Sequence, residues 1–211
     1  MINEQIIAEK LLQVHAIKLQ PEQPFTWASG WKSPIYCDNR KSLGHPFIRD
    51  FIKSELCNVL FEQFDHVNVL AGVATAGIPW GAMAADQLKQ PFCYIRSAPK
   101  AHGMGNQIEG YFEPGMKAVV IEDLISTGKS SMDAIKTCQA AGIEVIGCVA
   151  IFTYMFEQAK ALFAAENIPL IALSNYNVLL EVGIEKNIIT AEMLPLLNDW
   201  RKSPETWQGI Y

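Results

Sequence analysis

One stretch in the middle of the chain limits the possible folds more than any other. Residues 119–131 begin with a short β-branched run, which indicates a buried strand, and end in serine, threonine and glycine, which indicate a tight loop before a helix. Glu122 and Asp123 stand side by side where this strand should end. Because open α/β sheets bind ligands at the carboxyl ends of their strands, we expect these carboxylates to face a ligand.

The loop that follows these carboxylates is suited to an anion. It combines backbone N–H groups with the hydroxyls of Ser126, Thr127 and Ser130 at a predicted helix N-terminus, an arrangement that favours phosphate. Carboxylates beside such a cradle fit a phosphorylated sugar. The loop does not match a P-loop, because that motif requires a glycine five residues before Gly128, where Asp123 stands. An ordinary strand–turn–helix with Asp123 as the N-cap is the alternative.

Predicted strands and helices alternate along most of the chain, which indicates an α/β fold with a parallel sheet. An amphipathic helix is expected over residues 2–19, ended by Pro21 and Pro24. The other helices are expected near 44–64, 78–89, 128–140, 155–167, 175–186 and 190–201, and further strands near 67–71, 92–96, 109–112, 145–152 and 170–173. The small residues of 72–79 predict a loop that lets a ligand approach the backbone closely.

Composition narrows the class of protein. The 211 residues suit one domain, half of them are hydrophobic, and the net charge of −5 argues against nucleic-acid binding. The N-terminus has no signal-peptide pattern, and the uncharged run 67–85 is interrupted by Pro79 and glycines, so neither secretion nor a membrane span is expected. The five cysteines have no paired spacing, which is typical of cytosolic thiols. We therefore expect a cytoplasmic protein.

Two further segments carry candidate site residues. Residues 97–107 contain few core residues and two glycines, and with Arg96, Lys100 and His102 they form a predicted mobile loop whose cations suit a diphosphate. A solvated hairpin loop is the equal alternative. Residues 25–38 predict two short strands around a Ser-Gly turn and gather four aromatic side chains. Core packing is the favoured interpretation of those aromatics, and a wall over a flat ligand is the other.

Residues 119–131 resemble the phosphoribosyl diphosphate (PRPP) signature of the type I phosphoribosyltransferases at every position: a hydrophobic strand, two acids, two hydrophobic residues and a Thr/Ser-Gly loop. Residues 96–110, 71–79 and 25–38 resemble the orotate phosphoribosyltransferases, most specifically in the pattern Arg-x-x-x-Lys-x-His-Gly that starts at Arg96. The resemblance covers nearly the whole chain. It implies a single domain over 1–211, with a mainly parallel sheet flanked by helices and a small N-terminal hood from about 20–40.

The resemblance also implies the reaction and its residues. The enzyme would transfer the phosphoribosyl group of PRPP to orotate, with Lys100, His102 and Asp123 as catalytic residues. Orotate would contact Ser126, Tyr36 and Lys32. PRPP would contact Thr75, Ala76, Arg96, Lys100, His102, Glu122, Asp123, Leu124, Ile125, Ser126, Thr127, Gly128, Lys129 and Ser130. Magnesium is the implied cofactor, held by PRPP and water without direct protein ligands. A homodimer that shares the 97–108 loop between sites is the implied assembly.

Several positions depart from the enterobacterial form of this family. Ala28 and Ala76 stand where that form has lysines, Ser97 replaces another lysine, and Tyr154 replaces an arginine that meets the orotate carboxylate. These departures leave the contact for that carboxylate open. Two alternatives therefore remain: a purine or uracil phosphoribosyltransferase, and a non-catalytic regulator of the same fold that senses PRPP.

Overall fold

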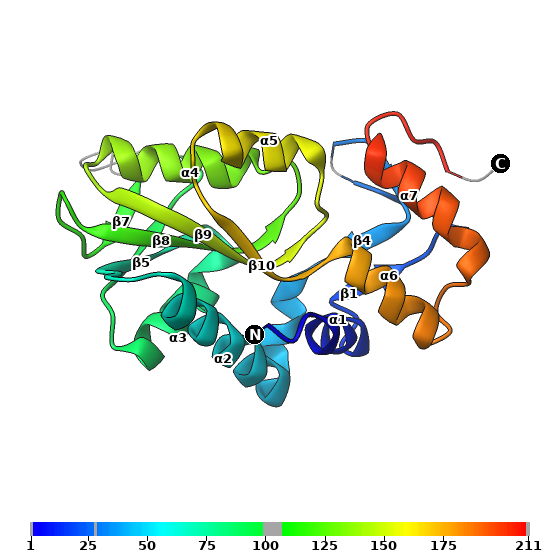
Figure 1. Cartoon of the computed structure of the whole chain (residues 1–211), viewed down its shortest axis with the longest axis horizontal. Coiled ribbons are helices and arrows are strands. Elements are labelled where there is room, and N and C mark those ends of the chain that lie inside the picture. Colours follow the sequence, from blue (N-terminus) through cyan, green and yellow to red (C-terminus); the bar gives the residue numbers. More distant parts are fainter. Residues whose placement is uncertain (1, 28, 99–106, 210–211) are drawn as a thin grey trace.

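A six-stranded sheet forms the centre of the protein (Figure 1). The computed structural model describes residues 2–27, 29–98 and 107–209. The sheet has the order β10-β9-β8-β5-β6-β7, and all neighbouring strands are parallel except β6 and β7. Its strands are β5 (Val69–Val73), β6 (Phe92–Ile95), β7 (Ile108–Gly110), β8 (Lys117–Ile125), β9 (Glu144–Thr153) and β10 (Leu170–Asn175). The predicted mainly parallel α/β sheet is confirmed.

Helices cover both faces of this sheet. Figure 1 shows α2 and α3 below the sheet, α4 and α5 above it, and α1, α6 and α7 at one end. The helices are α1 (Glu4–Gln13), α2 (Pro46–Gln63), α3 (Gly77–Leu88), α4 (Lys129–Ala140), α5 (Glu157–Ala165), α6 (Tyr176–Glu185) and α7 (Leu194–Lys202), with 3-10 turns η1 (Asn39–Gly44) and η2 (Ala191–Met193). Most of these elements agree with the predicted ranges to within a few residues.

Strand β8 is buried on both faces, which explains its continuous apolar sequence. Val119 and Ile121 pack into the core between the sheet and helices α2 and α3. Ala118 and Val120 pack into the core between the sheet and helices α4 and α5. All four side chains are fully buried. The central strand is therefore held firmly. It continues to Ile125, paired with β9, and so extends two residues beyond the predicted end at Glu122 and Asp123.

The prediction of one helix over residues 2–19 is wrong at its C-terminal end. Helix α1 ends at Gln13, and His15 adopts a left-handed conformation with φ of 53°. Residues Ile17–Leu19 then form β1, which pairs antiparallel with β4 (Ile35–Cys37). Ile17 and Leu19 are buried, and the lysine between them is exposed, which is the alternation of a strand. Because β4 is available as a partner, this segment forms a strand and not another helical turn.

The N-terminal hood contains two small antiparallel pairs. One is β1 with β4, and the other joins β2 (Phe25–Thr26) to β3 (Lys32–Ser33). The C-terminal helix packs against this hood, because the Trp200 indole donates a hydrogen bond of 3.1 Å to the main-chain oxygen of Lys32. Trp200 itself is fully buried. Segments from both ends of the chain thus build the same part of the molecule.

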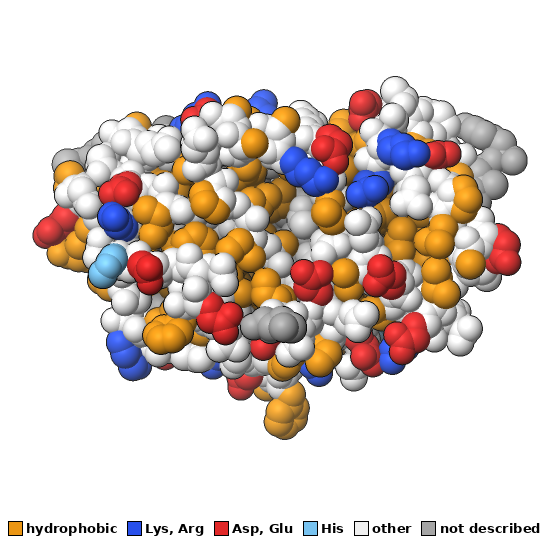
Figure 2. All heavy atoms as spheres, in the orientation of Figure 1, with side chains coloured by type: hydrophobic (Ala, Val, Ile, Leu, Met, Phe, Trp, Pro, Cys, Tyr) orange, Lys and Arg blue, Asp and Glu red, His pale blue; other side chains and the backbone are white. Residues whose placement is uncertain are grey.

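The outer surface mixes side chains of different kinds. In the orientation of Figure 2, acidic and basic side chains are interspersed, and hydrophobic side chains are visible between the helical layers. None of the helices in the described ranges is long and apolar enough to cross a membrane.

Candidate active site

A polar cavity of about 360 Å³ opens at the carboxyl ends of the central strands. We call it the polar cavity. The end of β8 contributes carboxylates, the link between β5 and α3 contributes backbone, and the start of η1 contributes a charged pair. Its lining residues are Cys37, Asp38, Arg40, Val73, Ala74, Thr75, Ala76, Glu122, Asp123, Leu124 and Ser130. The structure therefore brings together the predicted carboxylates, the small-residue loop and part of the predicted phosphate loop.

The two carboxylates of β8 are held in different ways. Glu122 is only 5% exposed and accepts hydrogen bonds of 3.0 Å from the Ser131 hydroxyl and from the main-chain N–H of Asp123. Burial, together with the neighbouring Asp123, raises the pKa of Glu122 to about 8. Burial also raises the pKa of Asp123, although Arg40 opposes that shift. Near neutral pH the pair therefore tends to retain a proton, which a bound cation would displace.

The loop after β8 leads directly into α4. Gly128 has φ of 79°, a conformation that favours glycine, and its main-chain oxygen accepts from the N–H of Met132 to start the helix. Any side chain at this position would also press on Phe163. The first backbone N–H groups of α4 lack partners within the helix, as in every helix N-terminus. Ser130, in the first turn, lines the polar cavity, so this anion-binding end adjoins it.

The link between β5 and α3 lies tightly against β8. Ala74, Thr75 and Ala76 line the polar cavity, and the Ala74–Thr75 peptide bond is cis. Gly77 starts α3 so close to the main-chain oxygen of Ile121 that no side chain fits there. The backbone of this link can therefore approach a ligand held by the β8 carboxylates.

A second, mostly apolar cavity of about 250 Å³ lies next to the first. We call it the aromatic cavity. It is lined by Thr26, Trp27, Tyr36, Cys37, Leu124, Ser126 and Tyr154. Two of the three candidate orotate contacts, Tyr36 and Ser126, lie in its wall. Its shape and aromatic lining suit a flat ring.

The aromatic residues of 25–38 both pack and line a cavity. The Trp27 ring centroid lies 5.3 Å from that of Tyr154 and 5.8 Å from that of Trp200, so Trp27 belongs to a packed cluster. The same ring forms one side of the aromatic cavity. The expected core packing is therefore present, and the alternative of a wall over a ligand is compatible with it.

Lys32 reaches this cavity indirectly. Its ammonium donates a hydrogen bond of 2.7 Å to the hydroxyl of Thr26, which does line the cavity. A hydroxyl that accepts from an ammonium keeps its own proton free to donate. Thr26 thus presents a polarised donor to anything bound between Trp27 and Tyr36.

The polar and aromatic cavities meet at Cys37 and Leu124, which line both. Burial raises the pKa of the Cys37 thiol well above its usual value, with a further contribution from Asp123. Cys37 therefore remains a neutral thiol near neutral pH. A ligand in the aromatic cavity would touch a ligand in the polar cavity at this border.

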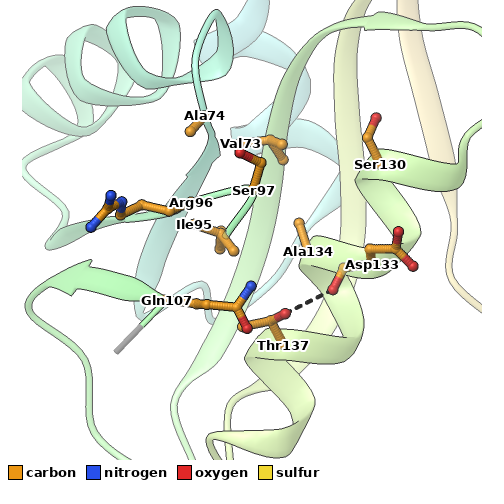
Figure 3. A pocket seen from close by; sticks show the side chains of 10 residues that line it. All are labelled: Val73, Ala74, Ile95, Arg96, Ser97, Gln107, Ser130, Asp133, Ala134 and Thr137. Atoms are coloured by element: carbon orange, nitrogen blue, oxygen red, sulfur yellow. Dashed lines mark hydrogen bonds between the residues drawn. The ribbon is translucent and has the colours of Figure 1, made fainter. Parts of the chain in front are cut away.

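A third, smaller cavity of about 120 Å³ lies where residues 97–107 leave and rejoin the sheet. Figure 3 shows Val73 and Ala74 facing Ser130 and Asp133 across it, with the Arg96 side chain pointing away from α4. The guanidinium of Arg96 instead pairs with Glu109 on β7 at 3.2 Å. Lys100 and His102, both predicted to be catalytic, lie outside the described residues.

The structure places the side chains of the remaining predicted site residues outside the lining of the polar and aromatic cavities. The side chain of Ile125 is fully buried in the core, so only its backbone is near the site. Thr127, Gly128 and Lys129 belong to the loop and the start of α4 and do not line either main cavity.

Sequence reasoning missed Asp38, Asn39 and Arg40. Asp38 and Arg40 line the polar cavity, and the buried amide of Asn39 donates a hydrogen bond of 2.6 Å to the main-chain oxygen of Asp123. A polar run directly after an apolar strand was the signal that could have revealed them.

Among the described residues, no group of three or more His, Cys, Asp or Glu side chains is arranged to hold a metal ion by itself. Asp38, Glu122 and Asp123 nevertheless place three carboxylates in the polar cavity. Oxygen ligands of this kind suit a hydrated magnesium ion that keeps several of its waters.

Comparison with known proteins agrees with this geometry. A family model described as "Phosphoribosyl transferase domain" matches residues 52–163. The chain is 53% identical over 206 residues to a protein of Bacteroides thetaiotaomicron named orotate phosphoribosyltransferase, covering 98% of this chain and 97% of that protein.

Solved structures give the same result. The crystal structure of orotate phosphoribosyltransferase from Aeropyrum pernix matches with a TM-score of 0.72 and 29% identity, covering 83% of this chain and 96% of that one. The UMP synthase of Leishmania donovani matches with a TM-score of 0.77 and 27% identity over 94% of this chain, which spans 43% of that longer protein.

Proposed function

This chain belongs to the orotate phosphoribosyltransferases, and from that premise we propose how its two cavities carry out the reaction. The enzyme transfers the 5-phosphoribosyl group from PRPP to orotate, giving orotidine 5′-phosphate and diphosphate in the synthesis of UMP. A bond forms between a ring nitrogen of orotate and C1 of the ribose, and the N–H bond of that nitrogen breaks, its proton passing to the departing diphosphate or to water. The bond from C1 to the diphosphate oxygen breaks, and its electron pair leaves with the diphosphate.

The observation that carries the proposal is the common border of the polar and aromatic cavities at Cys37 and Leu124. PRPP in the polar cavity and orotate in the aromatic cavity would bring C1 and the ring nitrogen together there. Holding two reactants in this way supplies a large part of the rate enhancement without a covalent enzyme intermediate.

PRPP would bind along the edge of the sheet. Its 5′-phosphate would lie in the loop Ser126–Ser130 at the start of α4, where unpaired N–H groups favour an anion. Its ribose hydroxyls would donate to Glu122 and Asp123, and its diphosphate would meet the backbone of Thr75 and Ala76. Of these proposed contacts, Thr75, Ala76, Glu122, Asp123 and Ser130 line the polar cavity.

Orotate would lie between the rings of Trp27 and Tyr36, with Ser126 at the edge of its ring. Tyr154, in place of an arginine, leaves the described lining of the aromatic cavity without a cation. The Lys32 ammonium places a positive charge next to Thr26, which lines this cavity, through the 2.7 Å hydrogen bond between them. We assign the orotate carboxylate to the hydroxyl of Thr26, with Lys32 as its positioning residue.

The cations Arg96, Lys100 and His102 would close over the diphosphate, Lys100 and His102 assisting its departure. Transition-state charge is then stabilised by groups that are already oriented, and closure excludes the water that would hydrolyse PRPP. Asp123 and Glu122 would stabilise the positive charge that develops on the ribose.

We propose a homodimer in which the 97–108 loop of one subunit serves the site of the other. Exposed aromatic side chains support an interface: Phe47 is 91% and Phe61 82% exposed, about four turns apart on one face of α2. Large exposed apolar side chains of this kind mark interaction surfaces.

We also propose magnesium as the cofactor and the cytoplasm as the location. Bound with PRPP, magnesium would neutralise part of the diphosphate charge. The three carboxylates of the polar cavity support its binding through water. All five cysteines are free, and four of them are buried, which is typical of a reducing compartment.

The test is the loss of orotate absorbance when the purified protein is mixed with orotate, PRPP and magnesium. A decrease that requires both PRPP and magnesium supports the proposal. If no decrease occurs with orotate, the same assay with adenine, hypoxanthine, xanthine and uracil tests the other phosphoribosyltransferases. PRPP binding without turnover of any base would instead favour a regulator.

A further inference from the structure

We propose that Arg40 binds the diphosphate of PRPP from within its own subunit. This inference rests on the proposed placement of PRPP in the polar cavity. Arg40 is the single Lys, Arg or His side chain among the described residues that line this cavity, which also contains the carboxylates of Asp38, Glu122 and Asp123. A cavity with three carboxylates would repel a diphosphate unless a cation stood beside it.

The guanidinium of Arg40 is already oriented. Its Nε donates a hydrogen bond of 2.6 Å to the Asp38 carboxylate. The Asp38 side chain is only 16% exposed, so this carboxylate holds the guanidinium in a defined orientation. The Arg40 side chain remains 61% exposed. Within the described part of the chain, the structure gives the two Nη groups no partner. The outer edge of the guanidinium therefore has donors ready for a phosphate, in the planar geometry that suits bidentate contact.

The backbone beside Arg40 is fixed to the rest of the site. The neighbouring Asn39 is fully buried and donates to the main-chain oxygen of Asp123 at 2.6 Å. The turn η1 thus cannot move away from β8 without breaking that bond. Arg40 also acts electrostatically on Asp123, because it lowers the pKa of that carboxyl. The cation and the carboxylate that would hold the ribose are therefore parts of one rigid unit.

The position of Arg40 supplements the backbone contacts proposed for the diphosphate. Thr75 and Ala76 line the same cavity and can offer backbone N–H groups, but neither side chain contributes a charge. The cations Lys100 and His102 belong to the 97–108 loop, which the proposed dimer assigns to the neighbouring subunit's site, and Arg96 pairs with Glu109 on β7. Arg40 gives each subunit a cation of its own at the proposed position of the diphosphate.

Binding of inorganic diphosphate with magnesium, measured by calorimetry, tests this role. Arg40→Ala should weaken diphosphate binding roughly tenfold, as expected for loss of a charged hydrogen bond. Arg40→Lys should restore part of it, because it keeps the charge but not the planar fork. Binding of ribose 5-phosphate, which has no diphosphate, should change less than about twofold.

Lys41→Ala is the matched control. It removes the same charge from the next residue of η1, but the Lys41 ammonium points to the main-chain oxygen of His15 at 3.4 Å and does not line the polar cavity. It should leave diphosphate binding unchanged. An equal effect of Lys41→Ala and Arg40→Ala would reduce the role of Arg40 to long-range charge and overturn the proposal.

Two further outcomes would also overturn it. Unchanged diphosphate binding in Arg40→Ala is one. The other is that Arg40→Ala weakens the binding of diphosphate and of ribose 5-phosphate equally, and that Asp38→Asn has the same effect. This result would mean that the Asp38–Arg40 pair only holds the turn in place. Turnover of orotate by the unaltered enzyme tests the proposed function separately, so failure of one idea is distinguishable from failure of the other.

Discussion

The side-chain amide of Asn39 donates a hydrogen bond of 2.6 Å to the main-chain oxygen of Asp123, although 84 residues separate them in the sequence. The bond joins the end of the hood to the end of the central strand. The oxygen of the same amide accepts a hydrogen bond of 3.4 Å from the thiol of Cys37, which lines both the polar and the aromatic cavity. One buried amide thus links the proposed acceptor site to the proposed donor site.

Asn39→Ala should therefore affect both stability and PRPP binding. The change leaves the Asp123 oxygen without its buried donor, so the free energy of unfolding in urea should fall by about 1–3 kcal/mol. The KM for PRPP should rise more than the KM for orotate, because Asp38 and Arg40 lose their anchor. The control is Asn58→Ala, which removes a 3.4 Å bond to Glu55 within α2 and should change neither KM. Equal KM values in Asn39→Ala and the unaltered enzyme would contradict the prediction.

Glu122 should make stability depend on pH. Burial raises its pKa from 4.5 to about 8, so between these values the folded state holds a proton that the unfolded state has lost. The contribution of Glu122 to the free energy of unfolding is thus greatest below pH 4.5 and declines as the pH rises to about 8. The decline is at most about 1.4 kcal/mol per pH unit.

Glu122→Gln should remove this dependence. Measured by urea unfolding across the same range, the variant should gain stability relative to the unaltered enzyme as pH rises. Glu144→Gln, at an exposed position paired with Lys117 at 3.7 Å, is the control and should keep the original slope. A constant difference between Glu122→Gln and the unaltered enzyme at every pH would show that Glu122 does not titrate in this window.

Trp200→Phe should weaken orotate binding selectively. The change keeps an aromatic ring against Trp27 and Tyr154 but removes the 3.1 Å hydrogen bond to the Lys32 main-chain oxygen. Loss of that bond should cost about 1 kcal/mol of stability. It should also loosen the strand that carries Lys32, so the KM for orotate should rise roughly threefold while that for PRPP stays constant. Trp207→Phe is the control, and a rise in both KM values would contradict the selectivity.

Lys100→Ala should lose most of kcat while PRPP still binds, if Lys100 assists the departing diphosphate. Asp123→Asn should also be nearly inactive, because it weakens the proposed contact with the ribose.

When the two inactive variants are mixed and allowed to exchange subunits, half of the dimers become mixed. If the loop serves the partner's site, each mixed dimer has one intact site, and activity should recover to about a quarter of normal.

The unmixed variants, treated identically, are the control for this recovery. No recovery despite confirmed subunit exchange would place Lys100 and Asp123 in the site of the same subunit. Near-full activity of Lys100→Ala alone would instead remove it from the leaving-group role.

The strands and the carboxylate pair were predictable because their signals are local. The β-branched run before Glu122 and the Gly128 loop after it specify a strand, a turn and a helix within 13 residues or so, and packing on both faces of the sheet supports the same choice. The parallel order followed from the alternation of strands and helices.

The parts that were missed depend on contacts between distant segments. Nothing near residues 14–19 reveals that β4 offers a partner, so the first helix was predicted too long. Likewise, the Asn39 side chain acquires its role only when η1 meets the end of β8, and Trp200 acquires its role only when α7 meets β3. Long-range hydrogen bonds of this kind leave no periodic pattern in the sequence.

The close packing of Gly77 against the Ile121 oxygen also has a consequence for substrate choice. This packing holds the start of α3 against the strand that leads into the predicted phosphate loop, so we expect the two proposed anion-binding ends to keep a constant separation. The site should therefore select a donor by the distance between its phosphate and its diphosphate. A sugar with one carbon more or fewer between its phosphate and its diphosphate would fit one end only, and would be rejected by length before its chemistry mattered.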